Sequence, residues 1–269
     1  MEYLSFNFIQ NAIIAAVLVS IACGIVGSLV LTNRLVAMVG GISHAAYGGL
    51  GISLYFGVST MLSSLAFVLV CACLIAYLSK NYKNQDAVIG VVWAFGMSVG
   101  IMLSDLSPNS NTVVFSYLFG AILAVSSADL FSMLIANIAF IIMFLVFYRQ
   151  LVGVSVDSEF CKVRGVNAEM IYYMLIIAAS ICIVISLRVV GMVLILALLC
   201  IPSYISSMFC KSLISMSICS VILSLIFCLG GLILSIIYNL SSGAAIILLA
   251  CCGFCLAYII KIFCRKYTN

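Results

Sequence analysis

The chain has 269 residues, of which 67% are hydrophobic and only 7% are charged, with a formal net charge of +4 and a mean hydropathy of +1.40. Soluble domains are about 45–50% apolar and about 25% charged, so this composition excludes an ordinary water-soluble protein. The apolar residues lie in blocks long enough to cross hydrocarbon, where the backbone must satisfy its own hydrogen bonds. We therefore expect an all-α, polytopic membrane helix bundle.

Nine blocks are predicted to form transmembrane helices, because a helix needs about 20 residues to cross about 30 Å of hydrocarbon. The first block is too long for the apolar region of a signal peptide and has no basic segment before it, so it is kept as a helix. Residues 113–125 are apolar but too few to cross, which predicts a half-helix or a segment buried against the bundle. The predicted spans are residues 8–31, 36–56, 60–78, 87–103, 128–148, 171–187, 189–209, 215–238 and 243–263.

The basic residues predict the orientation, since Lys and Arg are enriched in cytoplasmic loops. With the amino terminus outside and the carboxy terminus in the cytoplasm, Arg188 is the single basic residue left on the exterior. The positive net charge then reflects membrane topology, and nothing suggests a nucleic-acid groove. We expect residues 1–269 to form one transmembrane domain. The cytoplasmic residues are Arg34, Lys80, Lys83, Arg149, Lys162, Arg164, Lys211, Lys261, Arg265 and Lys266.

Motifs for chemistry are sparse. The chain has no G-x-x-x-x-G-K-[ST] phosphate loop and no G-x-G-x-x-G after a strand, so ATP hydrolysis would belong to another subunit. One histidine and a few carboxylates at helix ends do not make a catalytic set, and we do not expect an enzyme. The 13 cysteines lie almost entirely in apolar spans, which favours small packing side chains over a disulfide or metal framework.

His44 is the main candidate for function, because an ionisable group deep inside a membrane span is costly. A neutral imidazole is a good ligand for transition-metal ions, with Ser43 and Tyr47 as possible auxiliaries. The alternative is a histidine that only hydrogen-bonds a neighbouring helix. Small residues at helical spacing would let other helices approach closely around the ring. These are Gly40, Gly48 and Gly51.

Other polar positions have structural interpretations. Asp86 and Asp129 stand at predicted helix starts, where a carboxylate suits the helix dipole, and Asp129 is expected to be an amino-terminal cap rather than a ligand. Arg188 is expected to snorkel or to pair locally. Pro202 is expected to kink its helix, because proline cannot donate the backbone hydrogen bond. The segment 149–170 is the longest hydrophilic stretch. Phe160 and Val163 within it are spaced i, i+3, which predicts a short amphipathic helix on the membrane face, with a solvated loop as the alternative.

Several segments, in order along nearly the whole chain, resemble the permease subunits of metal-ion ABC importers, which move zinc, manganese or iron(II) across bacterial inner membranes. The most specific is similar to the family pattern Val-Gly-x-x-Leu-x-x-Ala-Leu-Leu-x-x-Pro. Another carries the Ser-His-Ala of the family's second helix. The segments are residues 38–51 (MVGGISHAAYGGLG), 86–90 (DAVIG), 117–123 (YLFGAIL), 187–202 (LRVVGMVLILALLCIP) and 242–246 (SGAAI).

The resemblance implies a homodimer, two ATP-binding subunits on the cytoplasmic side and an extracytoplasmic metal-binding protein. It implies no permanently bound cofactor, the metal being substrate and passing near His44 at the midplane. The segment 157–167 would be the helix that couples the permease to the ATPase. Its coupling residues would be Asp157, Glu159, Phe160, Arg164 and Gly165.

The chain departs from the family at one position. Many members carry an Asp four residues before the motif histidine, and here that residue is Gly40. The site should then hold a cation more weakly, or recruit a hydroxyl, thioether or thiol from nearby. Two other functions stay open: an ABC permease for a metal chelate or haem, and an ATP-independent metal transporter or channel.

Overall fold

The computed structural model describes residues 7–268 except 82–83, 108–109, 121 and 123–124, and every regular element within this part is helical. Several of these helices are much longer than the mean of about 11–12 residues in globular proteins. The elements are α1 (Asn7–Thr32), α2 (Val36–Phe56), α3 (Thr60–Asn81), α4 (Gln85–Asp105), α5 (Ser110–Phe119), α6 (Ser127–Val156), α7 (Ser158–Val163), α8 (Ala168–Val190), α9 (Met192–Phe209), α10 (Leu213–Tyr238) and α11 (Ser242–Thr268).

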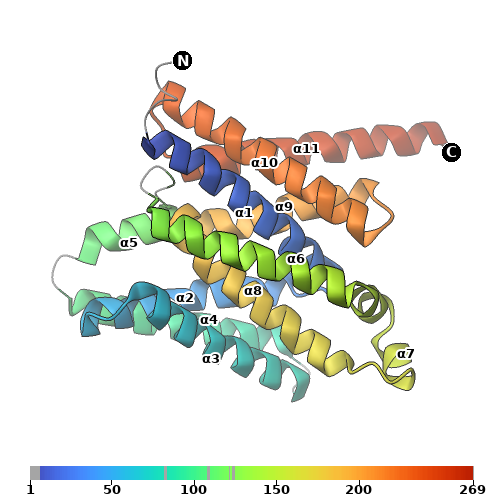
Figure 1. The fold of residues 1–269 in the computed structure, drawn as a ribbon, viewed down its shortest axis with the longest axis horizontal. Coiled ribbons are helices and arrows are strands. Elements are labelled where there is room, and N and C mark those ends of the chain that lie inside the picture. Colours follow the sequence, from blue (N-terminus) through green and yellow to red (C-terminus); the bar gives the residue numbers. More distant parts are fainter. Residues whose placement is uncertain (1–6, 82–83, 108–109, 121, 123–124, 269) are drawn as a thin grey trace.

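The long helices run side by side in one bundle (Figure 1). Helices α2, α3 and α4 pack on one another along one side, and α9, α10 and α11 pack together on the other. Helices α1, α6 and α8 lie between these groups, with α8 contacting α3 and α1 contacting α9 and α10. The short helix α7 lies at one end of the bundle, where α6 passes into α8, and α5 lies at the other.

Within the described part of the chain, eight helices are long and apolar enough to cross a membrane, which confirms a membrane helix bundle. Helix α2 is not among them, although its 21 residues are enough to span. Glycines, His44 and two tyrosines lower its hydropathy. Most of α2 is buried against other helices, so it meets little lipid and does not need a strongly apolar surface.

Several predicted boundaries differ in the structure. Helix α6 continues to Val156 instead of ending at 148, because Leu151 is fully buried in its extra turns. The break between α8 and α9 falls at Gly191, whose φ is 85°, and not at Arg188. The predicted half-helix exists as α5, but it covers ten residues, Ser110–Phe119.

Ion pairs join α8 to its neighbours at both ends. At its start, Glu169 pairs with Lys80 at the end of α3, at 2.5 Å. In its last turn, Arg188 pairs with Asp129 at the start of α6, at 3.1 Å. The expectation of a local partner for Arg188 is confirmed. The cap of α6 is Ser126, however, whose hydroxyl accepts from the Asp129 backbone.

Helices α2 and α4 pack with almost no side chain between them. A Cβ atom added to Gly51 would lie 2.6 Å from the Gly100 carbonyl oxygen, and one added to Gly100 would lie 2.5 Å from the Tyr47 carbonyl oxygen. Gly48 likewise faces the backbone of Gly96. These contacts match the close packing of small residues typical of membrane helices.

Gly40 does not take part in this packing. A Cβ added there would meet nothing within 4 Å, so no helix of the same protomer approaches it. The close contact expected at this glycine is absent from the described part of the chain, because the α2–α4 contact passes through the adjacent Gly41 and Ile89 instead.

Replacing Gly100 by Val should separate α2 from α4, because the new methyl groups would meet the Tyr47 backbone. Overpacking typically destabilises by about 1–3 kcal/mol. We expect a lower midpoint of thermal unfolding in detergent. Gly90→Ala on the same helix is the matched control, since a Cβ there meets nothing and alanine favours helix by about 0.5–1 kcal/mol. Equal stability of the two variants would contradict the packing described.

Candidate functional site between α2 and α4

The His44 ring stacks on the indole of Trp93, with ring centroids 4.3 Å apart and planes 15° from parallel. His44 lies eight residues into α2 and Trp93 eight residues into α4, roughly 12 Å along each helix. The two helices run in the same direction, since Gly41 contacts Ile89 near their starts and Gly51 contacts Gly100 near their ends. The two rings therefore share one depth inside the bundle.

The Nδ1 atom of His44 is buried, and no hydrogen-bond partner for it is found among the described residues. Such an atom costs about 1–3 kcal/mol relative to a satisfied one, so its presence needs an explanation. The alternative considered above, a histidine that hydrogen-bonds a neighbouring helix, finds no support at this nitrogen. The ring as a whole is half-buried, and a neutral imidazole in this position is chemically suited to bind a cation through its unprotonated nitrogen.

Trp93 and Met97 complete the α4 side of the site. The Trp93 Nε1–H donates to the Met97 sulfur at 3.1 Å. Trp93 is 41% exposed, so the described residues leave this side of α4 partly uncovered. Neither Trp93 nor Met97 was predicted from the sequence as a site residue. The single tryptophan of the chain and the i, i+4 spacing to a methionine were the available signals.

The two proposed auxiliary hydroxyls are placed differently from the imidazole. The Ser43 hydroxyl donates to the Gly40 carbonyl at 2.8 Å, and the side chain is fully buried. Tyr47 is 5% exposed and lies against Gly100. The described residues show no contact between either hydroxyl and His44. Gly40, one turn before His44 on the same helix face, has open space beside it.

The half-helix α5 supports α2 just beyond the histidine. Its Tyr117 hydroxyl lies 3.3 Å from the Ala46 carbonyl of α2 and 3.2 Å from the Ser64 hydroxyl of α3. Gly120 follows with φ 77°, and a Cβ there would lie 2.1 Å from the Val190 carbonyl of α8. Only glycine allows this approach, so α5 ties the α2–α3 side of the bundle to α8.

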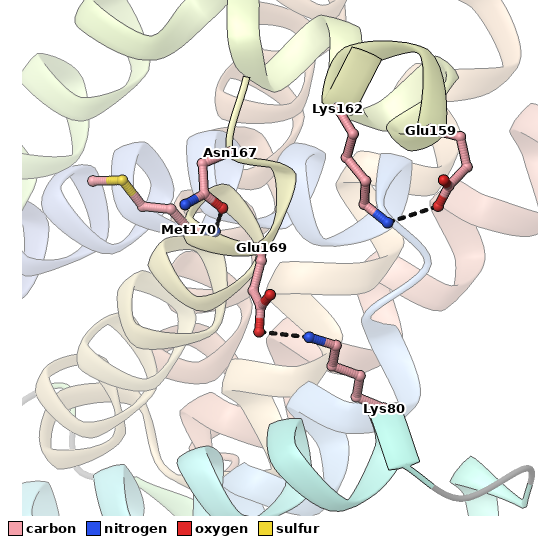
Figure 2. A network of polar contacts seen from close by, with 6 residues as sticks. All are labelled: Lys80, Glu159, Lys162, Asn167, Glu169 and Met170. Atoms are coloured by element: carbon pink, nitrogen blue, oxygen red, sulfur yellow. Dashed lines mark hydrogen bonds and ion pairs between the residues drawn. The ribbon is translucent and has the colours of Figure 1, made fainter. Parts of the chain in front are cut away.

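The segment between α6 and α8 forms a compact turn around α7 (Figure 2). The Asp157 carboxylate caps α7 by accepting from the Phe160 backbone at 3.0 Å. At the other end, Gly165 has φ 80°, and the N–H groups of Gly165 and Val166 bond back to the carbonyls of Lys162 and Cys161. These two hydrogen bonds form the Schellman motif, which ends a helix at a residue in the left-handed backbone conformation, most often glycine.

The surface of α7 combines charges with exposed apolar side chains. Glu159 and Lys162 pair at 2.7 Å, and the Arg164 guanidinium lies 4.8 Å from the Phe160 ring centroid. Phe160 is 53% exposed and Val163 is 88% exposed. The predicted i, i+3 apolar pair therefore faces outward from the bundle and is available to a partner.

Pro202 lies buried inside α9, which continues through it to Phe209. The Ser206 hydroxyl donates to the Pro202 carbonyl at 2.8 Å. One turn earlier, a Cβ on Gly27 of α1 would lie 2.3 Å from the Leu199 carbonyl. The bend expected at this proline stays a prediction, but the backbones of α1 and α9 do approach closely beside it.

Residues 5–261 match the model of the ABC 3 transport family. The chain belongs to this family. Membership confirms the resemblance to permeases of metal-ion ABC transporters, and it makes the chain a permease subunit that is not itself catalytic.

Relatives of this ABC 3 family chain cover almost its whole length. An uncharacterised membrane protein of Synechocystis sp. is 37% identical over 98% of this chain and 93% of its own. The manganese transport system membrane protein MntC of Halalkalibacterium halodurans is 30% identical over 96% of this chain and 88% of its own. A solved structure, PsaBC from Streptococcus pneumoniae in complex with Fab, matches with a TM-score of 0.89 and 29% identity, over 98% of this chain and 96% of that chain.

His44→Phe should leave the fold at least as stable as the wild type. Phenylalanine keeps a ring against Trp93 and removes the buried nitrogen that has no partner, which is destabilising by about 1–3 kcal/mol. Thermal unfolding of the purified chain without added metal tests this, with His44→Ala as the variant that also loses the ring contact. A clear drop in the unfolding midpoint for His44→Phe would show that the histidine serves packing.

Proposed function

We propose that this ABC 3 family permease is the membrane subunit of an ATP-driven manganese importer in a bacterial inner membrane. The observation that carries the proposal is the half-buried imidazole of His44, whose buried Nδ1 has no partner among the described residues, one turn from the open space at Gly40. The name of the MntC relative supports manganese as the cargo. One imidazole does not determine which divalent ion of the first transition row a site prefers. Zinc and iron(II) are therefore the competing cargoes.

We place the metal path along the uncovered α4 face beside His44. In a homodimer this face would meet its copy, so that two imidazoles approach a shared path near the midplane. The partly exposed side chain of Trp93 supports an interface there. The Met97 thioether offers a further, softer ligand from the same helix.

Nine crossings, with the amino terminus outside, follow if α2 is counted as a span. The beginning of α1 and the end of α11 lie at opposite ends of the bundle, as an odd number of crossings requires (Figure 1). The basic residues of the α7 end, among them Lys162 and Arg164, support a cytoplasmic position for that end. The whole chain would then act as one permease domain.

The α7 turn is the surface on which we expect an ATP-binding subunit to dock. Phe160 and Val163 point away from the bundle, while the cap at Asp157 and the turn at Gly165 hold the helix rigidly. Glu169, next along the chain, is paired with Lys80 of α3 (Figure 2). A displacement of α7 would thus be transmitted through the Glu169–Lys80 ion pair to α3, and from α3 to α2, which packs on it. ATP-driven docking would rock the bundle between outward-facing and inward-facing states, with metal delivered from outside by a binding protein.

Gly40 is where this chain should differ from relatives that have a carboxylate there. The neighbouring space is open, so an aspartate could be accommodated without displacing backbone. Without it the site carries no negative charge from α2 and should bind a divalent cation weakly. This predicts a permease that releases its ion readily.

Transport in proteoliposomes with the ATPase and binding protein tests the metal path. We expect ATP-dependent uptake of Mn²⁺, strong loss in His44→Phe, and a lower half-saturating Mn²⁺ concentration in Gly40→Asp, because a carboxylate one turn away attracts the cation. Gly40→Asn, with the same shape and no charge, is the matched control.

Three metals should be compared in parallel, namely Mn²⁺, Zn²⁺ and Fe²⁺. Full uptake by His44→Phe for all three would overturn the proposed path, and uptake without ATPase would favour the ATP-independent transporter. Uptake of zinc or iron alone would correct the cargo and keep the path.

Val163→Asp tests the docking surface. The side chain is 88% exposed, so the substitution should leave the unfolding midpoint unchanged while reducing binding of the ATPase and ATP-dependent transport together. The control is Ser155→Asp on the last turns of α6, outside the α7 turn. Normal ATPase binding by Val163→Asp would exclude α7 as the contact.

A further inference from the structure

A second feature of the bundle lies away from His44, on the side formed by α1, α2, α9 and α11. It is a groove of about 240 Å³. It opens at the surface, since the Tyr204 and Cys251 side chains in its wall are exposed. The lining residues are Leu31, Val36, Cys200, Ile201, Tyr204, Cys251 and Phe254.

The surroundings of the groove are hydrocarbon. Helices α9 and α11 are both long and apolar enough to span a membrane. The lining residues that these two helices contribute lie more than two turns from the helix starts. Water would find few hydrogen-bonding partners among apolar, thiol and aromatic side chains, and such cavities favour apolar occupants. The aromatic rings of Tyr204 on α9 and Phe254 on α11 contact each other, with ring centroids 5.7 Å apart, and together form part of the groove lining.

The end of the groove carries positive charge. Arg34 lies in the turn between Leu31 and Val36, both of which line the groove. Its backbone has a positive φ of 57°, so it belongs to neither α1 nor α2. It is exposed, and the described residues offer it no ion-pair partner. Lys261 follows Phe254 by seven residues on α11, which puts it on the same helix face, roughly 10 Å further along.

We propose that this groove binds an acyl chain of an anionic phospholipid, whose phosphate lies at Arg34 and Lys261. The apolar lining accounts for the chain and the two cations account for the charge of the headgroup, a pairing typical of anionic lipids at cytoplasmic helix ends. The bound lipid would bridge the α1–α2 turn to α9 and α11. The inference needs only that the bundle spans a membrane, so it does not depend on the transport function proposed above.

The test measures the phospholipid that co-purifies with the full-length chain from native membranes, by mass spectrometry. Cys251→Trp should fill the groove and reduce the retained lipid. Cys252→Trp is the matched control, because its neighbouring position is also exposed but does not line the groove. The unfolding midpoint of both variants is recorded alongside.

The charge is tested separately, so the proposal stays open to refutation if the tryptophan variant does not fold. Arg34→Gln should lower the preference for phosphatidylglycerol over phosphatidylethanolamine about fivefold, the effect of one cation near a membrane surface. Arg149→Gln, an exposed cation on α6, should leave the preference unchanged.

Three results would overturn the proposal. Unchanged lipid retention in folded Cys251→Trp would show that the groove is not the binding site. An unchanged headgroup preference in Arg34→Gln would remove the role of charge. Conversion of a dimer to a monomer by Cys251→Trp, with lipid unaffected, would show that a second copy of the chain covers the groove.

Discussion

The contact between α2 and α4 is the constraint on which the rest of the structure depends. Gly48, Gly51, Gly96 and Gly100 bring the two backbones together without side chains between them. In a membrane, helices are not driven together by the hydrophobic effect, so van der Waals contact over small residues holds them. This contact sets the register in which the His44 ring meets the indole of Trp93.

Many buried serines bond to the backbone of their own helix, as Ser20 and Ser180 do, while a smaller set of polar groups joins neighbouring helices. The ion pairs of Lys80 with Glu169 and of Arg188 with Asp129 hold α8 at both ends, and Tyr117 joins α5 to α2. The Nδ1 of His44 is one of five buried side-chain atoms without a partner in the described part of the chain; the others are the hydroxyls of Ser79, Ser104 and Ser224 and the Oδ1 of Asn137. His44 differs from these four residues because an imidazole is also a ligand for transition-metal ions, so a visiting cation would satisfy it.

Much of the fold could be predicted because hydrocarbon permits few solutions. Long apolar blocks indicate spanning helices, and the amphipathic spacing of Phe160 and Val163 indicated a short helix, which is present as α7. Boundaries were less predictable. The polar residue Arg149 suggested a helix end, yet α6 continues to Val156, because Leu151 in that extension is buried. Burial by tertiary neighbours, not local polarity, decides where such a helix stops.

By itself the sequence determined that this is an all-helical membrane permease with one histidine inside it, because composition, apolar block length and family motifs are all local properties of the chain. Only the tertiary structure decided what stands beside that histidine. Trp93 is 49 positions away in sequence and reaches His44 through the register of glycines on two helices, which no local pattern specifies. The same holds for Gly40: its role follows from the empty space around it, and empty space is a property of the packed helices alone.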